Sequence, residues 1–205
     1  MEFHRGEALK SEFNTFWTSI IGESDDYFSR MTNNDFDMLK TALSNVNNII
    51  TYNSTIELAT FLAKIFDLSA HDENDLLEQV RNTKPNANGF DIQYSKKVKI
   101  VAEVKCNRPV KGGNRFGAEQ KNGIAKDLRT LFNGKRGLNH ESLQDYYKIL
   151  GVYRFDSKTE EAIRHYLKHL PEDLIGYAEM FNADAVMIKE KVYVVLLNTV
   201  NDKEQ

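Results

Sequence analysis

Two acids and a lysine lie close together in one short part of the chain. Asp91 opens one β-like run, and Glu103 and Lys105 stand two residues apart near the end of the next. Successive side chains of a strand point to opposite faces, so Glu103 and Lys105 share a face. If the two runs pair, Asp91 reaches that face as well. Two carboxylates and an ammonium in so small a space indicate a site for a cation or for an anionic substrate.

Two strands have to position these side chains, and the sequence predicts them at residues 90–94 and 98–106. Lys96 and Lys97 are a plausible turn between the two strands. The segment 82–89 before them is rich in Asn and Gly, and the segment 107–117 after them contains a proline and two adjacent glycines. Such compositions are typical of loops.

The rest of the chain shows mainly helical periodicity. Ser54 and Glu57 have the spacing of a capping box, so we expect a helix to begin after Ser54. Helices are predicted at 7–20, 35–49, 55–66, 72–80, 118–132, 159–170 and 172–181, and further strands at 147–155, 185–188 and 192–198. This order predicts an α/β fold, a mixed sheet with helices packed on it. We expect residues 1–50 to be a helical extension packed on a core of residues 51–205.

The pattern resembles the PD-(D/E)xK nuclease superfamily, whose members share the restriction-endonuclease-like fold. The family motif has an acid at the start of one core strand and Glu-x-Lys in the next, here Asp91 and Glu103-Val104-Lys105. Helices before and after the strand pair and a further strand also match, so the resemblance covers residues 51–155. The proline of the family name is absent, because Gly89 and Phe90 precede Asp91. The resemblance implies a mixed central sheet flanked by helices.

The resemblance also implies a chemistry for these residues. Asp91, Glu103 and the carbonyl of Val104 would bind Mg²⁺, with Mn²⁺ as a substitute, because hard oxygen ligands suit this ion. The metal would polarise the phosphate and acidify a bound water. Lys105 would orient that water or stabilise the charge on the phosphate. Many family members carry another acid on the preceding helix. Glu57 is the candidate here and Glu78 the alternative, although the capping box explains Glu57 equally well.

Charge is distributed unevenly along the chain. Residues 96–136 contain 12 Lys or Arg and 3 Asp or Glu, while the protein as a whole has a net charge of −3. A positive segment on an acidic body is typical of nucleic-acid binding, and its alternative is a solvated lysine-rich surface. The candidates for binding DNA lie in the loop after the strand pair and at the start of the next helix: Arg108, Lys111, Arg115, Gln120 and Lys121.

Three functions remain open at this point. The first is a Mg²⁺-dependent DNA endonuclease, either a restriction enzyme or a DNA-processing nuclease, which as a homodimer would cut both strands. The second is a catalytically inactive nucleic-acid-binding or assembly domain of the same fold. The third is a plain α/β domain in which Glu103 and Lys105 are an ion pair on a half-exposed strand. The sequence does not distinguish DNA from RNA.

Several other kinds of site are unsupported by the sequence. The single cysteine, Cys106, excludes an internal disulfide and a cysteine-rich zinc site. His165 and His169 have the spacing of metal ligands on a helix, but the glutamate of a HExxH motif is missing, so we expect them on the surface. With neither a secretory signal nor an apolar run long enough to span a membrane, a cytoplasmic protein is expected.

Overall fold

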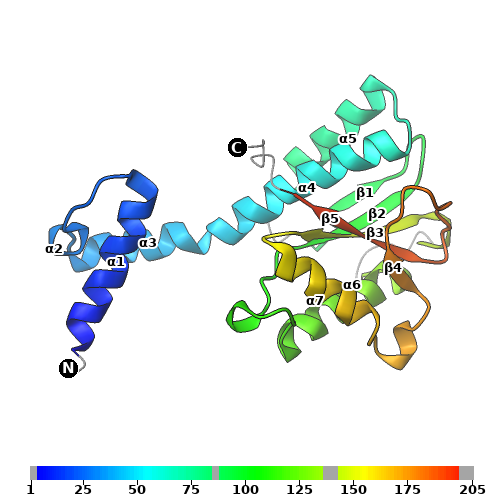
Figure 1. Ribbon diagram of the computed structural model, residues 1–205. Coiled ribbons are helices and arrows are strands. Elements are labelled where there is room, and N and C mark those ends of the chain that lie inside the picture. Colours follow the sequence, from blue (N-terminus) through cyan, green and yellow to red (C-terminus); the bar gives the residue numbers. More distant parts are fainter. Residues whose placement is uncertain (1–3, 85–87, 136–142, 199–205) are drawn as a thin grey trace. The chain divides into compact units, whose positions relative to one another are not determined.

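The computed structural model describes residues 4–84, 88–135 and 143–198 (Figure 1). The chain divides into two compact units, Met1–Val46 and Asn47–Gln205. Among the described residues, the first unit contains three helices, and the second contains a five-stranded sheet with helices on both faces. Within the described ranges, no helix is both long enough and apolar enough to cross a membrane.

The first unit is held by aromatic side chains. Its helices are α1 (Arg5–Ile21), α2 (Tyr27–Arg30) and α3 (Asn33–Ser44). The Phe13 ring packs edge-on against Phe28 at 5.9 Å and against Phe36 at 5.3 Å between centroids. None of the three helices has a fully buried residue. Edge-on contacts between aromatic rings therefore help to hold the three helices together.

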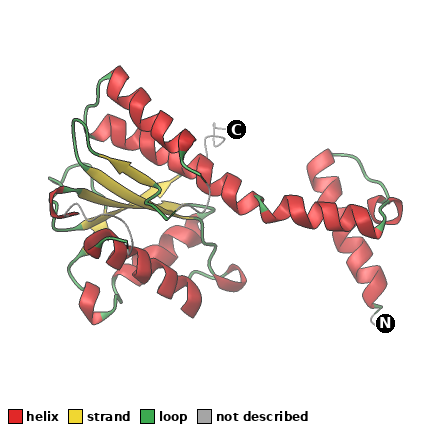
Figure 2. Cartoon of the chain, turned by 180° about the vertical axis from the view of Figure 1, so that it is seen from behind, coloured by secondary structure: helices red, strands yellow, loops and turns green. Residues whose placement is uncertain are grey.

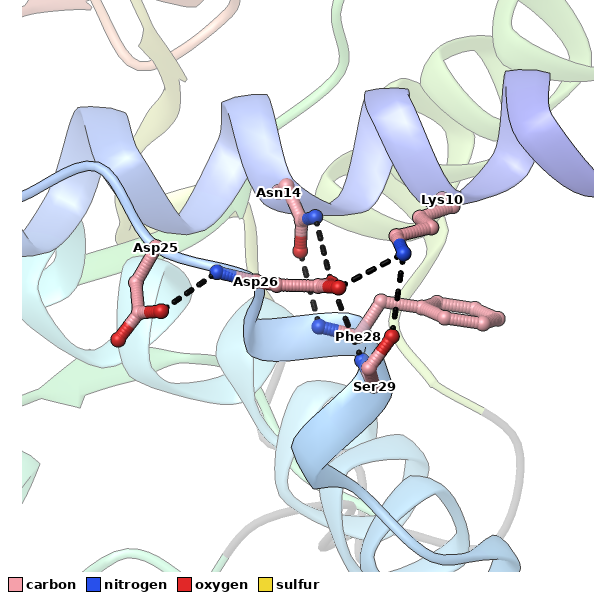
Figure 3. A network of polar contacts seen from close by, with 6 residues as sticks. All are labelled: Lys10, Asn14, Asp25, Asp26, Phe28 and Ser29. Carbon is pink, nitrogen blue, oxygen red and sulfur yellow. Dashed lines mark hydrogen bonds and ion pairs between the residues drawn. The ribbon is translucent and has the colours of Figure 1, made fainter.

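A polar network also ties α1 to the start of α2 (Figure 3). Asp26 is the N-cap of α2 and accepts a hydrogen bond from the Ser29 amide. Its carboxylate also forms an ion pair with Lys10 at 2.7 Å and accepts from the Asn14 amide group at 3.0 Å. Asn14 in turn accepts from the backbone N–H of Phe28. These contacts satisfy donors at the beginning of α2 that have no partner within the helix.

The second unit is built on a mixed sheet with the strand order β1-β2-β3-β5-β4. β1 pairs with β2 antiparallel, and all other pairs are parallel. The central strands are buried on both faces, as parallel strands covered by helices usually are. The strands are β1 (Ile92–Tyr94), β2 (Ile100–Lys105), β3 (Tyr147–Tyr153), β4 (Ala178–Met180) and β5 (Val192–Leu197).

Two layers of helices enclose this sheet (Figures 1 and 2). The helices α4 (Val46–Ile65) and α5 (Ala70–Asn82) form one core with the face of β2 that carries Ala102 and Val104. The helices α6 (Ala118–Asn133) and α7 (Ser157–Leu167) form the other core with the face that carries Val101. The predicted α/β class, a mixed sheet flanked by helices, is confirmed.

The prediction of a helix start after Ser54 is wrong. α4 runs without interruption from Val46 to Ile65, so Ser54 lies inside it and is only 2% exposed. The polar segment 51–54 contains neither Pro nor Gly, and nothing in it stops a helix. The capping box that explained Glu57 therefore does not exist.

The C-terminal part differs more from its prediction. The expected helix at 172–181 is a short 3₁₀ turn, Glu172–Leu174, followed by β4. Gly176, which has φ +81°, stands between the two and breaks any helix there. The expected strand at 185–188 is not a strand, and Val186 is 88% exposed. β5 pairs instead with β4 and β3.

Candidate functional site

The first acid of the predicted site is fixed to the strand that carries the second. Asp91 lies just before β1, and its Oδ2 atom accepts a hydrogen bond of 2.7 Å from the backbone N–H of Val104. The N–H and C=O groups of one strand residue point toward the same edge of that strand. The carbonyl of Val104 therefore also faces the side on which Asp91 lies.

Glu103 is the buried acid of the site. Its residue is 7% exposed, and burial together with the nearby Asp91 carboxylate raises the pKa of Glu103 to about 7. An ion pair with Lys135 at 2.6 Å acts in the opposite direction but does not outweigh the burial. Two close carboxylates in a half-closed site favour either a proton or a cation between them.

Lys105 forms an ion pair with Asp127, an acid outside the predicted site. Its ammonium lies 2.8 Å from Oδ2 of Asp127 on α6. The Asp127 side chain is 14% exposed, and burial raises its pKa, while the charge of Lys105 opposes that shift. The negative charge of Asp127 also contributes to raising the pKa of Glu103. Asp91, Glu103, Lys105, Asp127 and Lys135 thus form one charged group, here called the acid–lysine cluster.

Two clefts border the acid–lysine cluster, and the side chain of Lys135 lines both. A cleft of about 310 Å³ extends from Asp91 toward one face of α4. A wider one of about 680 Å³ contains Asp127 and the end of α6. The cluster is therefore accessible from two sides, although its acids are largely buried.

The donor groups of the cluster are of the kind that Mg²⁺ prefers. This ion is commonly held by one or two protein carboxylates and keeps several waters, and Asp91 and Glu103 provide two. In the described ranges, no group of three or more His, Cys, Asp or Glu is placed to hold a metal ion. The ammonium of Lys135 beside Glu103 indicates that this position accommodates a cation. Asp91 and Glu103 are therefore the two residues that would hold a Mg²⁺ ion, with water or substrate completing its coordination.

The structure does not bring Glu57 to the cluster. Its carboxylate accepts a hydrogen bond of 2.6 Å from the backbone N–H of Asn198, just after β5, and burial raises its pKa. The face of α4 that lines the smaller cleft has amide and hydroxyl groups but no acid; it consists of Asn48, Thr51, Tyr52 and Thr55. Glu57 follows Thr55 by two residues, about 200° around the helix. The alternative, Glu78, is an exposed residue paired with Arg81 at 2.8 Å.

The predicted DNA-binding residues lie in the loop after β2 and the first turn of α6. Arg108 is exposed and stacks on the Phe155 ring at 4.4 Å, and Arg115 is exposed beside Asn114. Gln120 has a structural role, because it accepts from the N–H of Gly117 and donates to the carbonyl of Arg108. Lys121 is half-buried, and Lys111 lies in a 3₁₀ turn, Val110–Gly112.

The basic segment is less positive in space than in sequence. Acids from other elements pair with several of its cations, for example Asp145 with Lys99 and Asp173 with Arg129. Among the side chains that the structure describes, Arg108, Arg115 and Lys121 are in no ion pair. These three remain available for phosphate groups.

Two members of the cluster were missed in the sequence. Asp127 carried a recognisable signal, since it lies three residues after Ile124 and four before Leu131, both on the buried stripe of α6. A charged residue in an apolar stripe needs a partner. Lys135 follows the Gly134 that ends the helix, and no periodicity distinguishes it from other lysines.

The two histidines lie at the surface, as predicted. His165, in the last turn of α7, and His169, two residues beyond its end, stack on each other at 4.2 Å between ring centroids, and both are at least partly exposed. Cys106 packs against the core formed by α4 and α5, and burial raises the pKa of its thiol.

Comparisons with protein-family models, with curated proteins and with solved structures found no match to this chain. Any function of this chain must therefore be inferred from the acid–lysine cluster and the residues around it.

Proposed function

We propose that the protein is a Mg²⁺-dependent endonuclease of the restriction-endonuclease-like fold that hydrolyses phosphodiester bonds in DNA. The observation that carries the proposal is the pair of carboxylates at the end of the β1–β2 hairpin. Asp91 is fixed on the amide of Val104, and its charge acts on the buried Glu103. A divalent cation between them would relieve this repulsion, and Lys105 stands on the same strand face as Glu103.

The roles of the residues follow from their positions. Asp91 and Glu103 would hold the ion, and the carbonyl of Val104 faces the same side. When bound, the ion neutralises phosphate charge and lowers the pKa of water. Lys105 would donate to a phosphate oxygen as its charge increases in the transition state. Asp127, at 2.8 Å from the ammonium of Lys105, would hold this lysine in position.

Partners follow from the charge around the cluster. The exposed guanidinium groups of Arg108 and Arg115 suit the backbone of DNA, since contacts to phosphate position a duplex without reading its sequence. Mn²⁺ should replace Mg²⁺. A homodimer would place two sites on one duplex, and sedimentation analysis with and without DNA would reveal it.

The test of this proposal is nicking of supercoiled plasmid with Mg²⁺ or Mn²⁺. Wild type should nick the plasmid, and Glu103→Gln and Lys105→Met should be slower by about 10²–10⁴-fold, the range typical of losing such groups. Matched controls are Glu172→Gln and Lys64→Met, which replace exposed residues away from the cluster and should cleave like wild type. Cleavage by Glu103→Gln at the wild-type rate would refute the assignment.

One observation favours the second candidate, a non-catalytic nucleic-acid-binding domain. Both lysines of the cluster are paired with acids, Lys105 with Asp127 and Lys135 with Glu103. Such mutual neutralisation is also what a purely structural ion-pair network would show. This candidate predicts that the protein retards DNA in a gel but cleaves neither DNA nor RNA with any divalent metal.

A further inference from the structure

Lys135 occupies an enclosed cation position within the acid–lysine cluster. Its ammonium lies 2.6 Å from Oε1 of Glu103 and donates to the carbonyl of Gly89. The Phe90 ring lies 5.1 Å from the same ammonium, close enough for a cation–π contact. A carboxylate, a carbonyl and an aromatic face thus surround one positive charge, and its side chain is only 21% exposed.

The same carboxylate is the one that the proposed function assigns to the metal. A divalent cation at Glu103 would face the ammonium of Lys135 at short range in a poorly screened place. Two cations cannot share that position at low energetic cost. The Lys135 side chain has open space to move away from Glu103, because it lines both clefts and is not enclosed in the core.

We propose that Lys135 acts as an exchangeable counter-ion: it neutralises Glu103 in the metal-free protein, is displaced by the divalent cation, and then binds a phosphate oxygen of the substrate. The exchange keeps the buried Glu103 paired in both states. The final step, phosphate binding, rests on the proposed function. The displacement itself concerns only the metal and this lysine.

The displacement predicts that removing the lysine strengthens metal binding. A ligand that has to displace an internal competitor binds more weakly, because only the fraction of protein molecules with a vacant site can bind it. Lys135→Met should therefore bind Mn²⁺ about tenfold more tightly than wild type. Isothermal titration calorimetry at pH 8.5 measures this, at a pH where Glu103, whose pKa is about 7, is ionised. Lys64→Met, on the exposed side of α4, should bind like wild type.

The outcomes separate the two proposals. Equal or weaker Mn²⁺ binding by Lys135→Met, with clear binding by wild type, would overturn the exchange and leave the metal site in place. If neither protein binds Mn²⁺, the metal site of the proposed function and the exchange both fail. For the phosphate step, Lys135→Met should bind DNA several-fold more weakly than wild type in Ca²⁺; unchanged affinity would overturn that step alone.

A second measurement needs no variant and so does not depend on how Lys135→Met folds. Brief acetylation of wild-type protein, read by mass spectrometry of its peptides, reports how accessible each lysine is. Mg²⁺ should increase the modification of Lys135 several-fold and leave Lys64 unchanged. Equal modification of Lys135 with and without a saturating metal concentration would overturn the displacement.

Discussion

The carboxylate of Asp91 accepts its hydrogen bond from the amide of Val104, the residue between Glu103 and Lys105. The first acid of the site is therefore held by the peptide backbone of the strand that bears the other two groups. Because the contact is local to one antiparallel hairpin, the position of the Asp91 carboxylate relative to β2 is set within that hairpin.

This hydrogen bond can be separated from the charge of Asp91. In Asp91→Asn the side-chain oxygen still accepts from Val104, so thermal stability should change little, but stabilisation by Mg²⁺ should disappear. Asp91→Ala removes both the hydrogen bond and the charge, so it should also lower the free energy of unfolding. A hydrogen bond to a charged group is worth about 1.5–3 kcal/mol. Thermal unfolding of both variants with and without Mg²⁺ is the measurement. A full Mg²⁺ effect in Asp91→Asn would contradict the metal assignment.

The pKa of Glu103 makes stability depend on pH. This pKa lies at about 7 in the folded protein and near 4.5 in the unfolded chain. Between pH 4.5 and pH 7 the folded state therefore binds more protons than the unfolded state. The free energy of unfolding should therefore decrease as pH rises from 4.5 to 7, by about 3 kcal/mol from this group. Urea unfolding at pH 5 and pH 8 should show that the free energy of unfolding decreases less between these two pH values in Glu103→Gln than in wild type. Equal losses would refute the raised pKa.

Glu57 should be dispensable for cleavage. Its carboxylate contacts the backbone of Asn198 rather than the cluster, and Gln at this position can still accept that hydrogen bond. Cleavage rates of Glu57→Gln should lie within about threefold of wild type, well under the loss expected for a general acid or base. A loss of a hundredfold or more in plasmid nicking would place Glu57 in the catalytic site after all.

Gly151 allows α4 to lie close to the sheet. A Cβ atom at this position on β3 would come within 2.9 Å of Leu58 Cδ2 and 3.0 Å of Leu197 Cδ1. Overpacking of this kind costs about 1–3 kcal/mol, so Gly151→Ala should lower the free energy of unfolding by that amount. Urea unfolding measures it. Gly123→Ala is the matched control, because a Cβ there meets no neighbour, and it should be neutral or stabilising.

The first unit should respond to acid through Asp26. The hydrogen bonds that Asp26 accepts from Lys10, Asn14 and Ser29 hold its pKa well below the usual range. The stabilisation by Asp26 is thus present at neutral pH and decreases as pH falls below 3.8. Trp17 is the only tryptophan, so its fluorescence follows this unit. Asp26→Ala should lower the urea midpoint of that signal at pH 7, and the difference from wild type should shrink in acid.

Much of the fold was predictable because long, strongly periodic segments dominate it. The helix at 118–132 matches α6, and the strand predictions for 98–106 and 147–155 contain β2 and β3. Short elements were not predictable. β4 has only three residues, too few for an alternation of polar and apolar positions to be distinctive, and its partner β5 follows it at a distance in the sequence.

The site was predictable only where it lies on one hairpin. Asp91, Glu103 and Lys105 come together through neighbouring strands, and spacing alone indicated that. The partners Asp127 and Lys135 come from α6 and the residues after it, brought back to β2 by the parallel crossover. The local sequence contains little signal for contacts between segments that a crossover brings together.

The two outermost strands of the sheet, β1 and β4, have three residues each. An edge so short exposes few free backbone N–H and C=O groups, and so offers little template for adding a strand from another chain. The sheet is thereby protected against growing into an aggregate. A functional pairing of two copies would then have to use helices or loops rather than extend the sheet.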